Sequence, residues 1–326
     1  MEAELSRTLP EDEGWQYEPK WDGFRCMANK DDDGVELWSK SGRELGRYFP
    51  EIVDALQAME PKQFLLDGEL VVPALPGDID QGLSFDALLQ RVHPAESRVH
   101  KLAQEQPAVF MVFDLLEDED GHAVLVLPLI ERRAHLEKFA GRFFEEEGRV
   151  MLSPAVDLDV ARTWLASPPP GLDGVIAKRL DLPYLEGSRD GMKKIKAVRT
   201  IDCVVLGFRT RKGADDEVGS LLLGLYSDDG AVRDVGFASS LSAHARKEWA
   251  QRLFPLAMAS LPAAKPARTS SRFAKGDERD WISVTPAIVV EVTCDTFSGG
   301  RFRYGAKILR LRPDKRPDQC RLDQLA

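Results

Sequence analysis

Short apolar runs of strand length recur along the chain of 326 residues, and they limit the folds that it can adopt. The runs are too short for typical helices and are rich in valine and leucine, a composition that favours buried strands. Clear examples stand at residues 64–72, 109–116, 203–206, 221–225 and 288–292. A chain with this many strands is expected to bury most of its apolar surface in sheets.

Helical patterns lie between the strand runs of the first part of the chain. The segments 48–59, 84–92 and 128–144 have the spacing or composition of helices. Strand-like alternation over residues 15–39, with a turn at residues 30–34, predicts a β-hairpin. Strand runs and helical segments together in this part of the chain predict the α+β class.

A change of pattern divides the chain into expected domains 1–199 and 200–326. The second domain has strand runs, a long hairpin turned at Asp228–Gly230, and one helix at residues 242–259. This order is typical of a small Greek-key β-barrel of the OB type. The Pro- and Ser-rich segment 261–270 is expected to be a mobile loop within that domain.

The formal net charge of −10 argues, by itself, against a nucleic-acid partner. The distribution of charge argues for one. Basic residues gather in segments 188–212 and 301–316, where they are interleaved with apolar residues such as Ile195 and Ile308. Folded elements that present a basic face are therefore expected, and they predict a phosphate-rich partner.

The N-terminal segment lacks the features of a signal peptide, and no apolar run is long enough to span a membrane. The cysteines are far apart in the sequence, without Cys-x-x-Cys spacing, which argues against a disulfide framework or a zinc site. They are Cys26, Cys203, Cys294 and Cys320. We expect a reducing compartment, the cytoplasm, and in a bacterium an association with the nucleoid.

The stretch EPKWDGFR, residues 18–25, places Lys20, Asp22 and Arg25 together on an expected strand that leads into a turn. A charged strand edge would explain it, and so would a nucleophilic lysine. Lys-x-Asp-Gly alone occurs by chance in roughly one chain of this length in twenty. Further segments follow it in a fixed order: WSKSGRE (38–44), LLDGELVV (65–72), FMVFDLL (110–116), LDGVIAK (172–178), MKKIK (192–196) and LRLRPDK (309–315).

The ordered set resembles the covalent nucleotidyltransferases, and most closely the ATP-dependent DNA ligases. The resemblance extends from about Trp15 to about Lys315. Within the family, the chain is similar to the small two-domain C-type ligases of bacteria. It implies an adenylation domain of antiparallel sheets with flanking helices, followed by an OB-fold domain. It also implies ATP, Mg²⁺ or Mn²⁺ and a lysine-AMP intermediate. The expected substrate is nicked duplex DNA, which the protein would seal during repair. We expect a monomer without a membrane segment, and its repair partners are unknown.

By this resemblance the catalytic residues are Lys20, the nucleophile, with Asp22, Lys194 and Lys196. An exposed lysine is protonated at neutral pH and not nucleophilic, and cations close by would favour its neutral form. The alternative for Lys194 and Lys196 is a solvated basic strand edge.

The resemblance also implies a set of nucleotide-binding residues. Glu18 would accept from the adenine amino group, Arg25 would hold the ribose or the nick phosphate, and Glu69 would bind the ribose hydroxyls. Phe113 would stack on the purine, although core packing explains it equally well. The set is Glu18, Arg25, Lys40, Arg43, Glu69, Phe113, Lys178, Arg310, Arg312, Asp314 and Lys315. Arg310, Arg312 and Lys315 would orient the pyrophosphate, with Asp314 positioning them.

Two positions depart from the family pattern. Asp173 stands where the fourth motif usually has Glu; we expect it to serve a Mg²⁺ site together with Glu69, with altered geometry or metal preference. Lys40 replaces the usual arginine after Ser39, and Arg43 is close enough in sequence to supply the bidentate phosphate contact that lysine lacks.

Other functions fit parts of the pattern. An RNA ligase or a GTP-using capping enzyme shares Lys-x-Asp-Gly, but EPKWDGFR and LRLRPDK favour a DNA ligase. A non-catalytic DNA-end-binding protein, inactivated through Asp173, would bind nicks without forming protein-bound AMP. NAD as the donor is disfavoured, because no additional N-terminal module that would recognise nicotinamide is expected.

Overall fold

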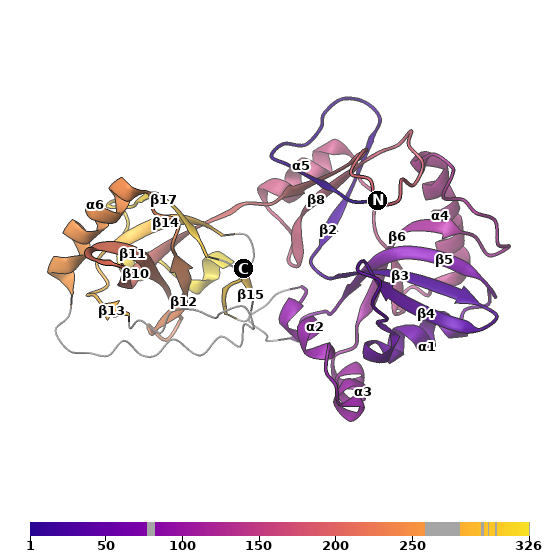
Figure 1. The fold of residues 1–326 in the computed structure, drawn as a ribbon, viewed down its shortest axis with the longest axis horizontal. Helices are drawn as coiled ribbons and strands as arrows, with labels where there is room; N and C mark the ends of the chain where they lie inside the picture. Colours follow the sequence, from indigo (N-terminus) through magenta and orange to yellow (C-terminus); the bar gives the residue numbers. More distant parts are fainter. Residues whose placement is uncertain (77–81, 258–280, 295–296, 299, 304, 326) are drawn as a thin grey trace. The chain divides into compact units, whose positions relative to one another are not determined.

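A computed structural model describes residues 1–325 except 77–81, 258–280, 295–296, 299 and 304. The chain forms two compact units, Met1–Ala197 and Val198–Ala326, where the sequence predicted a boundary at residue 199 (Figure 1). None of the helices within the described residues is long and apolar enough to cross a membrane.

The first unit contains a four-stranded sheet with one polar and one apolar face. Its order is β1-β9-β8-β2, with β1 at Glu4–Ser6, β9 at Met192–Lys196, β8 at Leu172–Arg179 and β2 at Trp15–Trp21. On the apolar face Tyr17, Val175, Ala177 and Ile195 pack against Ala161 of helix α5. The alternation of a strand then turns Lys178 of β8 and Lys194 and Lys196 of β9 to the opposite face.

A five-stranded sheet forms the main core of the first unit. Its order is β4-β3-β5-β6-β7, namely Gly34–Ser39, Phe24–Asp31, Phe64–Val71, Val109–Glu117 and Val150–Leu152. The inner face buries Cys26, Leu66 and Phe110, together with Ile52 of helix α1 and Phe139 of helix α4. The helices of this unit are α1 (Pro50–Ala58), α2 (Phe85–Arg91), α3 (Glu96–Glu105), α4 (Leu129–Phe143) and α5 (Leu158–Ala166).

The second unit is a small antiparallel barrel. Its strand order is β12-β11-β10-β14-β17, and β13 (Ile282–Ser283) pairs with β10. A parallel bridge between Ala238 and Ala306 joins the end of β12 to the segment before β17, and so links the two ends of this path. Helix α6 buries Trp249 and Leu253 against the sheet. The remaining bounds are β10 Arg199–Arg211, β11 Ala214–Tyr226, β12 Val232–Ala238, α6 Ala243–Leu253, β14 Val289–Cys294, β15 Phe297–Ser298, β16 Arg301–Phe302 and β17 Lys307–Leu311.

The structure changes several expected elements. The strand run that begins at residue 15 is broken at Asp22-Gly23 into β2 and β3, which belong to different sheets. Helix α6 ends at Leu253, and a 3-10 turn with Pro255 in its first positions follows, because proline cannot continue the hydrogen-bond ladder. Helices α3 and α5 were not expected. The predicted loop 261–270 lies outside the described residues.

Candidate active site

Lys20 lies opposite an irregularity in the pairing of β2 with β8. Pro19 pairs with Val175 and Trp21 with Leu172, so two residues of β8, Asp173 and Gly174, oppose Lys20 alone. Such a bulge bends a strand and redirects its side chains. Here it brings the Asp173 carboxylate into an ion pair with the Lys20 ammonium, whose side chain is 19% exposed.

Gly174 makes this local geometry possible. Its φ of +145° is rarely adopted by residues with a side chain, and a Cβ added there would meet the Ile195 carbonyl oxygen at 2.1 Å. The glycine of LDGVIAK is therefore required by the close approach of β8 to β9 beside Lys20.

Glu18 and Lys178 form a buried ion pair on the same polar face. Lys178 Nζ lies 2.7 Å from Glu18 Oε2, with both side chains at most 4% exposed. Gln16 donates to Glu18 Oε1 at 2.8 Å. Burying this pair costs solvation of both charges, which the electrostatic attraction and the Gln16 hydrogen bond offset. Glu18 is thus held rigidly on β2, two residues before Lys20.

Phe113 lies at a second bulge, in the pairing of β5 with β6. Asp67 pairs with Asp114 and Gly68 with Val112, so Phe113 is the additional residue. It is partly exposed, while the residues on either side of it are buried. Lys178 Nζ lies 4.4 Å from the ring centroid and the Arg25 guanidinium carbon 5.9 Å. The ring is placed at the charged cluster, and the alternative of plain core packing does not describe it.

Arg25 is held by a residue that the sequence analysis did not select. Its Nε and Nη2 donate to the two carboxylate oxygens of Asp67 at 3.1 and 2.7 Å. Tyr184 accepts from Arg25 Nη2 at 2.9 Å and donates to Asp67 Oδ2 at 2.8 Å. Burial is the largest influence on the Tyr184 hydroxyl and raises its pKa well above the usual value.

Asp67 and Tyr184 would be difficult to find from sequence. Asp67 belongs to the Asp-Gly pair of LLDGELVV, which resembles a turn, yet it is fully buried inside β5. Tyr184 lies in a segment without regular structure. Only a buried acid in an apolar strand signals that a cation must be its partner.

Glu69 on β5 lies opposite Arg25 on β3 in the antiparallel strand register. Burial raises its pKa to about 8 from the ordinary value of 4.5. Lys20 and Arg25 lower the pKa of this carboxyl, while Asp67 and Asp22 raise it. Lys20, Asp22, Arg25 and Glu69 therefore share one electrostatic environment, as expected of a site that tunes protonation.

Lys194 and Lys196 are half-buried on β9, on the polar face of the four-stranded sheet. Lys194 pairs with Ile176, which in turn pairs with Glu18, and Lys196 pairs with Gly174 opposite Lys20. Strand register therefore aligns Lys194 with Glu18 and Lys196 with Lys20, the two β2 residues of EPKWDGFR. Both side chains therefore occupy the Lys20 face, with β8 between them and β2.

Lys40 and Arg43 are exposed on the loop that follows β4. Lys40 Nζ pairs with Glu2 Oε1 at 3.0 Å. Within the described residues, no ion pair or hydrogen bond brings either side chain to Lys20. Their assignment to the nucleotide stays a prediction.

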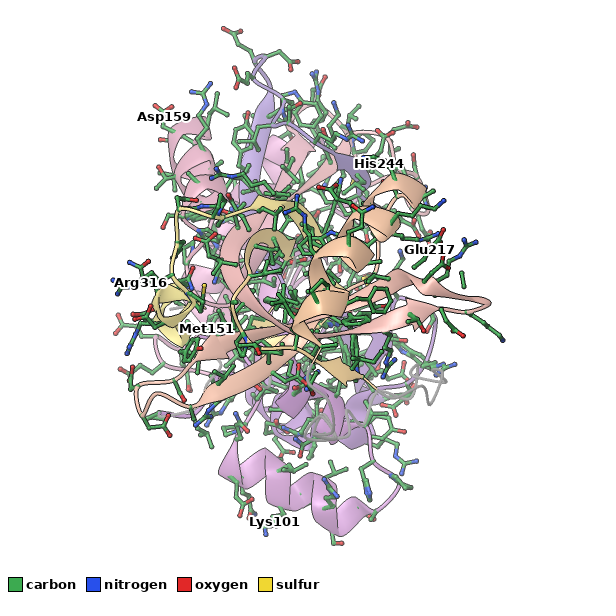
Figure 2. The ribbon with its side chains drawn as sticks, turned by 90° about the vertical axis from the view of Figure 1, so that its left-hand side faces the viewer. Lys101, Met151, Asp159, Glu217, His244 and Arg316 are labelled. Carbon is green, nitrogen blue, oxygen red and sulfur yellow. The ribbon has the colours of Figure 1, made fainter. Side chains whose placement is uncertain are left out.

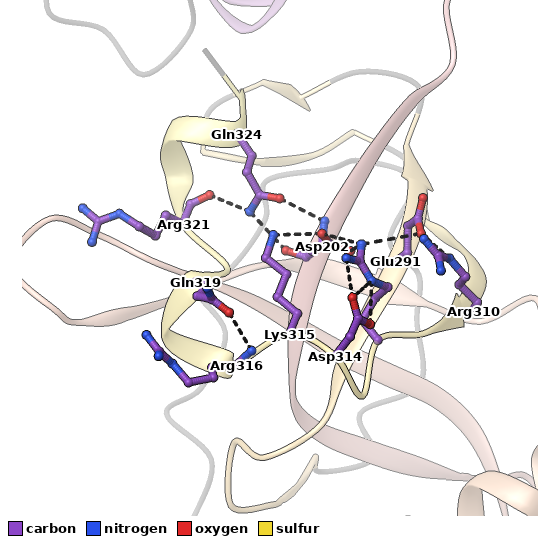
Figure 3. A network of polar contacts seen from close by, with 10 residues as sticks. Asp202, Glu291, Arg310, Asp314, Lys315, Arg316, Gln319, Arg321 and Gln324 are labelled. Carbon is purple, nitrogen blue, oxygen red and sulfur yellow. Dashed lines mark hydrogen bonds and ion pairs between the residues drawn. The ribbon is translucent and has the colours of Figure 1, made fainter.

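The cations of LRLRPDK lie in the second unit and are already paired with acids (Figure 3). Arg310 Nε donates to Glu291 Oε2 at 2.6 Å, and Arg312 donates to both Asp202 oxygens at 3.0 Å. Arg312 also binds Asp314, and its hydrogen bond lowers the Asp314 pKa to about 2.

Other residues of the expected basic face have acid partners too. Arg301 pairs with Asp234 at 2.7 Å, Arg211 with Glu217 at 3.1 Å and Arg316 with Asp318 at 3.0 Å. Figure 2 shows Arg316 projecting outward from its loop, like Asp159 on α5. Arg209 stacks over Trp281 at 4.2 Å. Several cations of the basic stretches are therefore paired with acids where they lie.

A divalent metal ion fits the surroundings of Lys20 only with ligands from elsewhere. Asp173 and Glu69 supply hard oxygen donors near the nucleophile, as Mg²⁺ requires. In the part of the chain that the structure describes, no group of three or more His, Cys, Asp or Glu residues could hold a metal. Mg²⁺ commonly binds one or two carboxylates and completes its shell with water and phosphate oxygens.

Family models match both units. The ATP dependent DNA ligase domain matches residues 3–196, and the ATP dependent DNA ligase C terminal region matches residues 214–315.

Individual proteins and structures are similar over nearly the whole chain. DNA ligase C1 of Mycolicibacterium smegmatis is 41% identical over 333 residues, which cover 100% of this chain and 92% of that protein. DNA ligase C of Mycobacterium tuberculosis is 39% identical over 344 residues, with the same two coverages of 100% and 92%. The crystal structure of the ligase domain of M. tuberculosis LigD is 29% identical, covers 98% of this chain and 97% of that one, and has a TM-score of 0.47.

These matches confirm the resemblance inferred from the ordered motifs, including the OB-fold assignment of the second domain. They imply ATP, a divalent metal ion and a DNA substrate. The chain belongs to the family of ATP-dependent DNA ligases.

Proposed function

We propose that this ligase seals nicks between a 5′-phosphate and a 3′-hydroxyl in duplex DNA, with Lys20 as its covalent nucleophile. The placement of Lys20 carries the proposal. It lies opposite a bulge, paired with Asp173, on the sheet face that also holds Glu18, Lys194 and Lys196. A surface lysine without a role would not need this combination of strained backbone and charge.

In the first step Lys20 Nζ attacks the α-phosphorus of ATP, a phosphoramide bond forms, and pyrophosphate leaves. The amine must lose a proton, and Asp173 Oδ2 is its immediate partner. Lys194 and Lys196 stabilise negative charge that develops on the phosphate. When bound, Mg²⁺ would neutralise phosphate charge, with Asp173 and Glu69 as its protein ligands.

In the second step the 5′-phosphate at the nick attacks the same phosphorus, and the Lys20–phosphorus bond breaks. In the third step the 3′-hydroxyl attacks the activated 5′-phosphate and AMP leaves. Glu18 and Phe113 hold the adenine, Arg25 holds the ribose or the nick phosphate, and Lys178 fixes Glu18. Asp22 adds negative charge beside Glu69. Arg310, Arg312 and Lys315 orient the pyrophosphate, with Asp314 positioning them, and Lys40 and Arg43 contact phosphate.

We infer that the protein works as a monomer in a reducing bacterial cytoplasm, near the nucleoid, in DNA repair. Multifunctional end-joining proteins named LigD are similar to it, at 32% identity for that of Pseudomonas aeruginosa. DNA binding is expected to weaken steeply with salt. Charge reversal at Arg209 and Arg211 that left nick affinity unchanged would exclude them from the DNA contact.

The first experiment incubates the protein with α-labelled ATP or GTP and Mg²⁺, with Lys20→Ala as the comparison, followed by denaturing electrophoresis. We expect a labelled band with ATP that is absent from the variant. Protein purified already adenylylated is first treated with pyrophosphate to remove AMP. Persistent absence of the band, with nick binding intact, would favour a non-catalytic DNA-end-binding protein, and sealing of RNA nicks alone would favour an RNA ligase.

A further inference from the structure

Two acids and one base occupy a single row across three strands of the second unit. Asp202 on β10 pairs with Glu291 on β14, and Glu291 pairs with Arg310 on β17. Like charges directly opposite each other on neighbouring strands repel and destabilise a sheet. Asp202 and Glu291 are compatible only because cations lie beside them.

Arg312 supplies positive charge at Asp202, and so does Lys315, which Figure 3 labels. Arg312 Nη1 lies 3.0 Å from each Asp202 oxygen and 3.8 Å from Glu291 Oε2. Lys315 Nζ lies 2.8 Å from Asp202 Oδ2. One carboxylate therefore anchors both cations of the RPDK segment, and its side chain is only 12% exposed.

The position of Asp202 itself is fixed through its backbone. Its N–H donates to Gln324 Oε1 at 3.1 Å, and Gln324 Nε2 donates to its carbonyl oxygen at 3.2 Å. Gln324 also donates to the Arg321 carbonyl at 3.0 Å. The anchor is thus held by its own strand and by the C-terminal 3-10 turn.

The second carboxylate that binds Arg312 is different. Asp314 accepts from Arg312 Nε and Nη2 at 3.0 and 2.8 Å, but its side chain is 61% exposed. Exposed ion pairs are weak and exchange readily. An incoming phosphate group can replace Asp314 on the Nε and Nη2 side of the guanidinium while Asp202 keeps Nη1 in place.

We propose that Asp202 is a positioning residue for self-adenylylation. Its anchored carboxylate holds Arg312 and Lys315 so that both cations face the departing pyrophosphate together. The inference rests on the proposed function. No motif of the family resemblance includes Asp202.

Two reactions of the full-length protein test this role. Self-adenylylation with ATP and Mg²⁺ needs the pyrophosphate contacts, whereas sealing of a nick that already carries 5′-AMP involves no pyrophosphate. For Asp202→Asn we expect adenylylation to slow by about tenfold to a hundredfold, the effect of a misplaced group. Sealing of the pre-adenylylated nick should stay close to the wild-type rate, because a residue that acts only on the pyrophosphate contributes nothing to that step.

A structural role alone would affect both reactions equally. Equal losses in a folded Asp202→Asn protein, or unchanged or faster adenylylation, would overturn the proposal. Asp202→Glu retains the charge and should recover part of the rate. If Asp202→Asn does not fold, Asp202→Glu replaces it. Slower adenylylation with unchanged sealing of the pre-adenylylated nick would then support the proposal, and equal losses in both reactions would overturn it. In a background of Arg312→Ala and Lys315→Ala, Asp202→Asn should have no additional effect, because the residue acts through those cations.

Asp228→Asn is the matched control. Asp228 is an acid of the same unit that pairs with Arg321, but its side chain is 97% exposed. Both reactions should be unchanged in this variant. A wild-type protein that neither forms the AMP adduct nor seals the pre-adenylylated nick would refute the proposed function itself, independently of Asp202.

Discussion

The two charged clusters of this ligase are built differently. In the first unit Lys178 and Arg25 each have a buried acid of their own: the side chain of Glu18, the partner of Lys178, is 2% exposed, and that of Asp67, the partner of Arg25, is fully buried. In the second unit Arg312 shares Asp202 with Lys315, while Arg310 and Asp314 are more than half exposed.

The difference suits two tasks. Buried, individually paired charges keep a nucleophile and its nucleotide contacts in one geometry, because breaking such a pair leaves a charge without solvation. Exposed pairs contribute little to stability and are exchanged for a ligand at low cost. The first cluster is therefore expected to be the more rigid, and the role proposed for the second is to transfer its donors to phosphate.

The largest effect is expected from Lys20→Arg, which keeps the positive charge beside Asp173 but removes the nucleophilic amine. Self-adenylylation should fall by at least about a thousandfold, as for other nucleophile replacements. Sealing of a pre-adenylylated nick should persist, since that step needs no nucleophile from the protein. An AMP adduct on this variant, detected by labelled ATP and electrophoresis, would place the nucleophile elsewhere.

Asp67→Asn should destabilise the first unit by about 3 kcal/mol, because it leaves Arg25 without the carboxylate that binds it through two nitrogens. Urea or thermal unfolding of metal- and nucleotide-free protein measures the change. A loss below about 1 kcal/mol, the range of surface pairs, would show that Arg25 is better solvated than its contacts indicate.

The pH dependence of stability should reflect Glu69. Its pKa is raised to about 8 from the ordinary value of 4.5, so the folded protein keeps a proton that the unfolded chain releases between these two values. The free energy of unfolding should therefore fall as the pH rises from 5 to 8, by about 3 to 4 kcal/mol. Glu69→Gln should flatten this trend. An equally steep trend in the variant would assign it to another group.

Tyr184→Phe removes one hydroxyl that both accepts from Arg25 and donates to Asp67, while the two carboxylate contacts of Arg25 remain. The expected loss of stability is about 1 kcal/mol, typical of one hydrogen bond. Chemical denaturation compares this variant with Asp67→Asn. Equal losses in the two would mean that the hydroxyl, rather than the carboxylate, holds Arg25.

The smallest effect is expected from Glu291→Gln in the second unit. The variant loses the pair with the exposed Arg310 but also relieves repulsion from Asp202 across the strands. Stability should change by less than about 0.5 kcal/mol. The same acid-to-amide change is thus costly at Asp67 and nearly neutral at Glu291, and comparable losses at both sites would remove the distinction between the clusters.

Much of the fold and the site could be predicted from the sequence because both depend on local patterns. Strand runs gave β5, β6 and β14, and the order of short motifs identified the family. Helices α3 and α5 were missed although both are amphipathic and Asp157 caps the start of α5. The helix predicted over residues 242–259 was too long, because Pro255 was not recognised as a residue that ends it.

The sequence by itself determined the family, the nucleophile expected within EPKWDGFR, and the strand alternation that turns Lys194 and Lys196 toward one face. Only the tertiary structure decided which acid meets each cation. Lys20 meets Asp173, 153 residues away, and Arg312 meets Asp202, 110 residues away. Strand pairing brings such distant charges into register, and no local spacing in the sequence encodes that pairing.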